Sequence, residues 1–141
     1  MLRAMTGRGC VWEVLSGDSL IVTYYESGAT AEQWSAYGRM MQTVRGRAAR
    51  YLIYCASVPP PDVLAQLASA ARGQPWQVAL ISPSTAVRFA ASTFAMIVRG
   101  FRFFPPEDLE RALEHLQCDK AEQQRARSAL LRCQGIELPQ T

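Results

Sequence analysis

Short runs of hydrophobic residues alternate with helical patterns along this chain of 141 residues. The first two runs, 11–15 and 20–26, are rich in valine, tyrosine and other residues that favour β-strands. Ser-Gly-Asp-Ser at 16–19 separates them and favours a turn, so the pattern predicts a β-hairpin. In the first run, Trp12 and Val14 share the more apolar face, and we expect this face to point at the core.

Four helical segments and three further apolar runs follow the hairpin. The helical segments have apolar residues at helical spacing behind a capping or proline-rich start, at about 30–46, 61–73, 84–100 and 107–116. Thr30 and Gln33 form the pattern of a capping box at the first of them. The apolar runs between the helices are predicted strands, at 51–56, 76–81 and 101–104.

This order of elements predicts an α/β fold. We expect a single mixed, largely parallel sheet of about five strands, with an N-terminal hairpin and helices packed on it. The chain divides into a flexible N-terminus at 1–10, an α/β domain at 11–117, and a C-terminal helix and tail at 118–141. The last helix, at about 120–133, has a thin apolar face, which leaves two interpretations: a loosely docked appendage or a partner-binding element.

Composition and charge exclude several classes of protein. A hydrophobic content of 49% with 19% charged residues is not typical of a disordered chain. The net charge is only +3, and the basic residues are scattered, so no nucleic-acid partner is predicted. The apolar stretches are too short to span a membrane, and the first residues do not form a secretory signal. We therefore expect a cytoplasmic protein with free thiols.

No metal site, cofactor or catalytic group is predicted. The four cysteines, Cys10, Cys55, Cys118 and Cys133, do not form a C-x-x-C motif, and their spacing does not indicate a metal site. The only histidine is His115, near a helix C-terminus, and the sequence pairs no serine or cysteine nucleophile with it. The protein is therefore expected not to be an enzyme.

The stretch 76–116 carries a resemblance to a known family. A buried strand leads to a helix, then the aromatic strand Phe-Arg-Phe-Phe at 101–104, then a helix with an acidic start at 107–116. With the preceding elements, this order resembles the STAS/SpoIIAA-like fold of anti-sigma-factor antagonists and related bacterial domains, over about 11–117. Within that family the order most resembles the SpoIIAA-like branch, whose scaffold is similar to that of the CRAL-TRIO lipid-binding domains. The resemblance implies a bacterial regulatory module that binds another protein.

The phosphoswitch of that family is only partly present. In the antagonists, a phosphorylatable serine follows the third strand within an Asp-Ser-Ser-Gly-like motif. Only Ser57 matches it here, because the acidic residue and the glycine are missing and prolines follow. The resemblance therefore implies the scaffold more strongly than the phosphoswitch. Ser57 and Asp62 are candidate partner-binding residues, with Ser57 as a candidate phosphosite; the alternative is an ordinary loop or cap serine.

Two further groups are candidates for a ligand or partner surface. Ser82, Ser84 and Thr85 follow a predicted strand at the edge where α/β folds bind ligands, although helix capping also explains them. The second group is an excess of large apolar residues, for which core packing is the alternative. It contains Phe89, Phe94, Met96, Ile97, Phe101, Phe103 and Phe104.

Three functions remain open. The first is a non-enzymatic, regulatory protein-interaction module that uses 57–67 and the exposed part of 89–104, with a homodimer as a further possibility. The alternative is a carrier of a small molecule or lipid, with an apolar pocket under the third helix of roughly a few hundred Å³. A small enzyme would instead need titratable groups that converge in a cleft.

Overall fold

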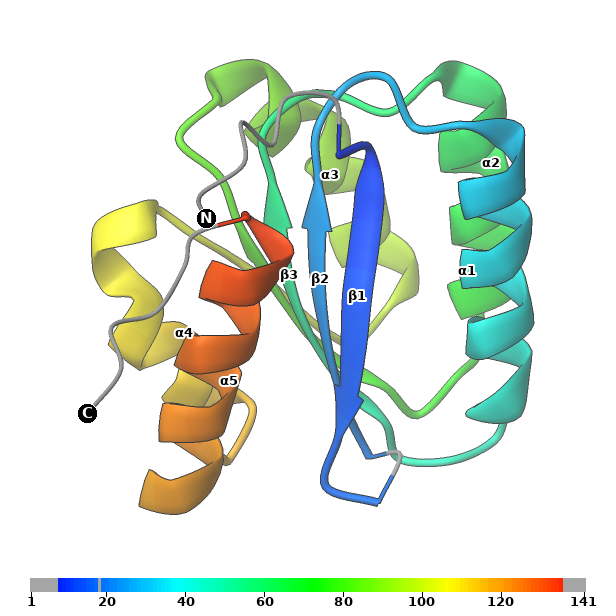
Figure 1. Cartoon of the computed structure of the whole chain (residues 1–141). Coiled ribbons are helices and arrows are strands. Elements are labelled where there is room, and N and C mark those ends of the chain that lie inside the picture. Colours follow the sequence, from blue (N-terminus) through cyan, green and yellow to red (C-terminus); the bar gives the residue numbers. More distant parts are fainter. Residues whose placement is uncertain (1–7, 18, 136–141) are drawn as a thin grey trace.

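Five strands form one sheet in the computed structural model, which describes residues 8–17 and 19–135 (Figure 1). The strands are β1 (Cys10–Leu15), β2 (Leu20–Tyr25), β3 (Arg50–Cys55), β4 (Gln77–Ile81) and β5 (Gly100–Phe104). They lie side by side in the order of the chain, β1 antiparallel to β2 and the other neighbours parallel. The predicted mixed, largely parallel sheet with an N-terminal hairpin is therefore confirmed.

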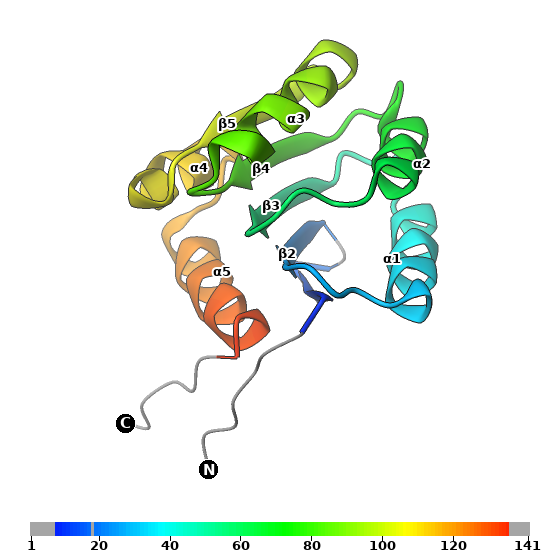
Figure 2. The ribbon, with the colours of Figure 1, turned by 90° about the horizontal axis from the view of Figure 1, so that it is seen from above.

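Helices cover both faces of this sheet (Figures 1 and 2). One face carries α1 (Ala31–Thr43), α2 (Pro61–Ala71) and α3 (Thr85–Ile97). The other carries α4 (Leu109–His115), which follows a short 3-10 turn at Pro106–Asp108, and α5 (Lys120–Cys133). Strand residues alternate between the two layers, so Ile21 and Tyr51 face the first core while Val22 and Leu52 face the second.

The three parallel crossovers all pass over the same face of the sheet. Their helices, α1, α2 and α3, connect β2 to β3, β3 to β4 and β4 to β5, and all three pack on that face. The strand order consequently never reverses along β2 to β5. Open α/β sheets form their ligand crevice at the strand ends where the order reverses. The order β1-β2-β3-β4-β5 contains no such point, so the strand ends of this sheet do not form that crevice.

The hairpin and the first helix test two predictions from the sequence, the capping box and the core-facing side of the first strand. Thr30 and Gln33 form the predicted capping box: Thr30 Oγ1 accepts from Gln33 N at 3.1 Å, and Gln33 Oε1 accepts from Thr30 N at 3.0 Å. Trp12 packs edge-on against Tyr37 with ring centroids 5.1 Å apart, as expected for a core-facing residue. Val14 does not follow it, because β1 is an edge strand and this side chain is 39% exposed. Asp18, in the predicted turn, lies outside the described residues.

The last helix is not loosely docked. Ala126, Ala129, Leu130 and Cys133 of α5 are buried against the sheet, beside β1 and β2. The apolar face is thin in the sequence because three of these four residues are small, but small residues let a helix backbone approach a sheet closely. The helix therefore belongs to the same folded layer as α4. The ends of the two predicted flanking segments, 1–7 and 136–141, lie outside the described residues.

Candidate functional site: an apolar cavity between sheet and helices

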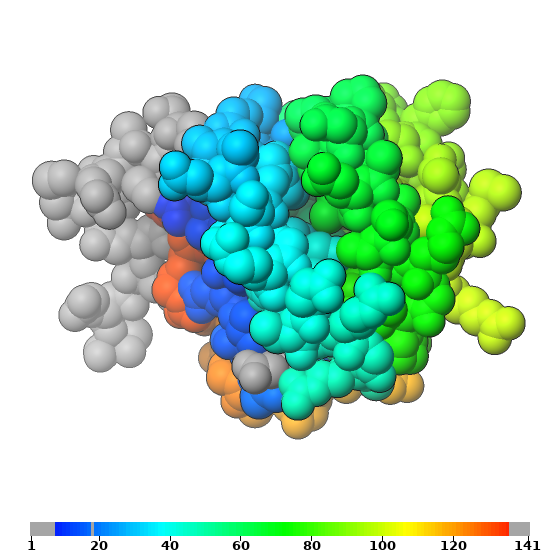
Figure 3. Space-filling view, turned by 90° about the vertical axis from the view of Figure 1, so that its right-hand side faces the viewer, coloured from blue at the N-terminus to red at the C-terminus, as the bar shows by residue number. Residues whose placement is uncertain are grey.

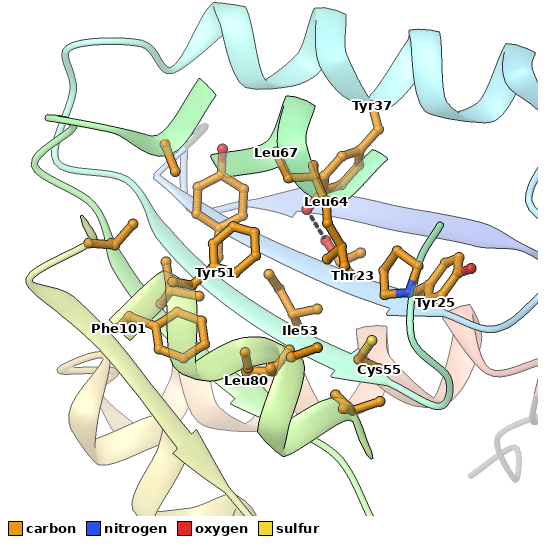
Figure 4. Close-up of a pocket in the computed structure, with 18 of the residues that line it drawn as sticks. Thr23, Tyr25, Tyr37, Tyr51, Ile53, Cys55, Leu64, Leu67, Leu80 and Phe101 are labelled. Carbon is orange, nitrogen blue, oxygen red and sulfur yellow. Dashed lines mark hydrogen bonds between the residues drawn. The ribbon is translucent and has the colours of Figure 1, made fainter. Parts of the chain in front are cut away.

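A cavity of about 120 Å³ lies between the sheet and helices α1 to α3 (Figure 4). All five strands contribute to its floor, with Tyr51, Ile53 and Leu80 among the labelled residues. The helices close it with Tyr37 of α1, Leu64 and Leu67 of α2, and residues of α3. Folded cores contain few voids larger than a water molecule, so a space of this size is a specific feature of the fold.

Small residues on two helices explain why the space stays open. Ala71 ends α2, and Ala90 and Ala91 lie in the middle of α3; all three line the cavity. An alanine side chain reaches only one carbon from the backbone, whereas the facing strand positions hold the large rings of Tyr25 and Tyr51. The short alanine side chains therefore leave part of the space between these helices and the sheet unfilled.

One buried hydroxyl among the described residues that line the cavity has no hydrogen-bond partner. The hydroxyls of Thr23 and Tyr37 are 2.9 Å apart and bond to each other. The indole nitrogen of Trp76 donates to the carbonyl of Val44 at 3.2 Å. The hydroxyl of Tyr51, in contrast, is buried and has no hydrogen-bond partner among residues 8–17 and 19–135, and only 2% of the residue is exposed. Burial raises the pKa of Tyr51, so the phenol stays neutral and can donate a hydrogen bond.

The two thiols that line the cavity are expected to be unreactive at neutral pH. Cys10 and Cys55 both line it, and burial raises the pKa of each to about 12. The Cys55 thiol also donates to the carbonyl of Ser57 at 3.1 Å. Because the thiolate is the reactive form, neither cysteine is set up as a nucleophile at neutral pH.

This burial predicts slow thiol labelling in the folded protein. A shift from 9.0 to about 12 lowers the thiolate fraction of Cys10 and Cys55 about a thousandfold near neutral pH, before any loss of access is counted. We expect Ellman's reagent to react with both thiols at least a thousandfold more slowly in native protein than in guanidinium chloride. Mass mapping of briefly alkylated native protein provides the check, and rapid labelling at either residue would contradict this account of the cavity wall.

Ser57 lies in the loop between β3 and α2, as predicted. Its Oγ is buried and makes no hydrogen bond of regular geometry within the described part of the chain. The Ser57 hydroxyl nevertheless lies near Tyr25. Burial raises the pKa of the Tyr25 phenol, and the nearby Ser57 hydroxyl partly offsets that rise. A kinase would reach this hydroxyl only if the loop opened. Asp62 is exposed in the first turn of α2, where a negative charge suits the helix N-terminus.

The second serine cluster starts α3. Ser82 lies at the same edge of the sheet as Ser57, because β3 and β4 are parallel and both residues follow the strand ends. The Ser82 hydroxyl accepts from the backbone nitrogen of Ser84 at 3.1 Å, and Ser84 caps α3 by accepting from Val87 N at 3.2 Å. Thr85 is exposed. These bonds give both serines a local structural role.

The aromatic stretch separates into inward and outward residues. Phe94 and Phe101 stack with centroids 6.1 Å apart and line the cavity. Phe103 packs against the same core, with the Arg88 guanidinium 5.5 Å from its ring centre. Phe104 is buried on the opposite face of the sheet.

Two large apolar side chains of α3 point outward. Phe89 is 77% exposed and Met96 is 86% exposed, and their separation of seven residues places them on one side of the helix. Side chains in the yellow-green of this segment project from one edge of the molecule (Figure 3). Arg88 and Arg99 flank them, and no acidic residue occurs between Asp62 and Glu107. We call Arg88, Phe89, Met96 and Arg99 the α3 face.

The described residues were also searched for a metal site and for a membrane-spanning helix. Among residues 8–17 and 19–135, no group of three or more histidine, cysteine or acidic side chains could hold a metal ion. No helix in the same ranges is long and apolar enough to cross a membrane.

A scan against protein-family models, a search of curated proteins and a search of solved structures all find no match for the chain.

Proposed function

We propose that the protein is a non-enzymatic interaction module that binds an acidic protein partner through the α3 face. The observation that carries the proposal is the exposure of Phe89 and Met96, with Arg88 and Arg99 close to them in the sequence, in a stretch without acidic residues. Exposed aromatic residues, methionine and arginine are enriched at protein interfaces. Complementary charge directs such a surface toward acidic partners.

The charge also argues against a symmetric homodimer through this face. A two-fold dimer pairs the same patch from both subunits, so Arg88 and Arg99 would face a second patch that carries arginines and no acidic residue. Like charges brought together at an interface cost free energy. The proposal therefore names a different protein as the partner, and analytical ultracentrifugation should show a monomer at micromolar concentration.

The regulatory part of the proposal rests on the element order. The sheet with a leading hairpin and three parallel crossovers is the arrangement expected of a STAS/SpoIIAA-like domain. We accordingly propose a bacterial, cytoplasmic regulatory module. Ser57 and Asp62 remain predicted contacts at the neighbouring helix start, without the phosphoswitch motif of the antagonists.

Synthetic peptides test the α3 face. The probe is an amphipathic helical peptide with leucines on one face and glutamates on the other, compared with a peptide in which lysine replaces each glutamate. Fluorescence anisotropy should show at least about tenfold tighter binding of the acidic peptide. Phe89→Asp should weaken that binding about thirtyfold, the effect of losing an aromatic anchor.

The matched control is Val14→Asp, which adds the same charge at an exposed apolar residue of β1. Its peptide affinity should equal that of the wild type. Equal affinity for the two peptides, or unchanged binding by Phe89→Asp, would reject the proposal. Sedimentation with phosphatidylserine vesicles that depends on Phe89, without peptide binding, would assign the face to a membrane instead.

A further inference from the structure

The cavity is too large for a packed core and unsuited to water. Apolar cavities stay dry, because a buried water needs two to four polar partners. The hydroxyls of Thr23 and Tyr37 bond to each other, and Tyr51, which also lines the cavity, has a buried hydroxyl without a partner among the described residues. One donor does not hold a water molecule well.

The size of the cavity sets the size of a ligand. About 120 Å³ is well below the usual range of pockets for drug-sized molecules, which excludes a lipid with two acyl chains from this space. It is close to the volume of an engineered cavity, about 150 Å³, that takes up benzene or xenon. The space therefore suits a molecule of about one six-membered ring.

The lining sets the chemistry of that ligand. None of the described residues that line the cavity is acidic or basic, so a carboxylate or ammonium group would lose its hydration without a counter-charge. The Tyr51 hydroxyl, in contrast, lacks an acceptor, and a buried donor without a partner is costly. A neutral oxygen acceptor on the ligand would satisfy it.

Two of the covering helices, α1 and α2, meet above the cavity. Tyr37 of α1 and Leu67 of α2 face each other above the cavity (Figure 4). In the space-filling view, the surface is hollowed between these two helices (Figure 3). Leu64 and Leu67 are only partly buried, so α2 is held less firmly than the central strands.

We infer that this cavity binds a compact, neutral, ring-sized apolar molecule with one oxygen acceptor, which receives a hydrogen bond from the Tyr51 hydroxyl. The site lies under α1, α2 and α3, separate from the outward α3 face. The inference therefore goes beyond the proposed partner binding and does not depend on it.

Two probes of equal heavy-atom count test it: cyclohexanone, which has a carbonyl acceptor, and methylcyclohexane, which lacks one. Binding is followed by chemical-shift changes in ¹⁵N-labelled full-length protein, and affinities come from the titrations. Both probes should shift amides of the cavity wall, including Ile53 and Leu80. Tyr51→Phe should weaken cyclohexanone binding about tenfold and change methylcyclohexane binding by less than twofold.

Two controls keep the outcome decisive. Cyclohexylammonium, which has the same number of heavy atoms but is charged, should not bind. Ala91→Leu, which places a larger side chain in the cavity, should abolish binding of both ring probes, with folding verified by the dispersion of the same spectra. If neither ring probe shifts the cavity amides, the site is rejected. If Tyr51→Phe weakens both probes equally, or neither, the role of the hydroxyl is rejected.

Discussion

Replacing Glu122 by alanine should lower the free energy of unfolding at neutral pH by about 3 kcal/mol, the range for breaking a buried ion pair. Glu122 of α5 and Arg50 of β3 lie 2.7 Å apart through Oε2 and Nη2, and a second contact, Oε1 to Nη1, spans 3.1 Å. Only 17% and 13% of the arginine and glutamate side chains are exposed. Removing the carboxylate would leave the guanidinium half-buried without its counter-charge.

The same pair predicts a dependence on pH. Hydrogen bonding to Arg50 lowers the pKa of Glu122 from 4.5 to about 2, against the opposing effect of burial. A folded-state pKa below the unfolded value means that the contribution is complete above about pH 4.5 and is lost as pH falls toward 2. Urea unfolding followed by circular dichroism should therefore show wild type and Glu122→Ala converging across that window.

Glu13→Ala is the matched control. Glu13 pairs with Arg132 of the same helix at 2.8 Å, but these side chains are 31% and 48% exposed. A pair in water contributes about 0–1 kcal/mol, so this variant should be nearly neutral. Equal losses in the two variants would show that burial does not set the strength of the Arg50 contact.

Leu113→Ala should cost about 3–4 kcal/mol, because it opens a void in a packed layer. Leu113 of α4 is fully buried in the core layer that α4 and α5 form with the sheet. Leu67→Ala is the comparison, since Leu67 is only partly buried and already borders an open space. We expect it to cost about 2 kcal/mol, at the low end of such substitutions.

Chemical denaturation of both leucine variants measures the difference. The slopes of the unfolding transitions should match the wild type, so that shifted midpoints report stability alone. A loss at Leu67 as large as that at Leu113 would mean that the first layer is packed as tightly as the second. That result would contradict the cavity itself.

Local patterns predicted the elements well because they are local. The capping box at Thr30 and the hairpin turn each depend on neighbouring residues, and the strand runs are read directly from their apolar content. The docking of α5 was not predictable in the same way, since alanines at 126 and 129 look neutral until the approach of the helix to the sheet is known.

The cavity was only partly accessible to sequence reasoning. An apolar pocket under the third helix was one of the expected alternatives, but its size depends on how the large and small side chains of the sheet and the helices pack together. The aromatic excess at 89–104 was visible, whereas its division into an inward Phe94 and an outward Phe89 depends on how α3 is rotated against the sheet. The unpaired hydroxyl of Tyr51 is a property of three-dimensional contacts alone.

The position of α5 also affects how the protein is made. This helix covers β1 and β2. The apolar side chains of Leu20 and Val22 are therefore buried only when residues of α5, more than a hundred positions later, have been made. At ordinary rates of translation, the ribosome needs roughly 5–20 s to add that length of chain. The growing polypeptide therefore carries an uncovered strand surface during most of its synthesis. Termination before α5 leaves that surface permanently exposed and open to aggregation.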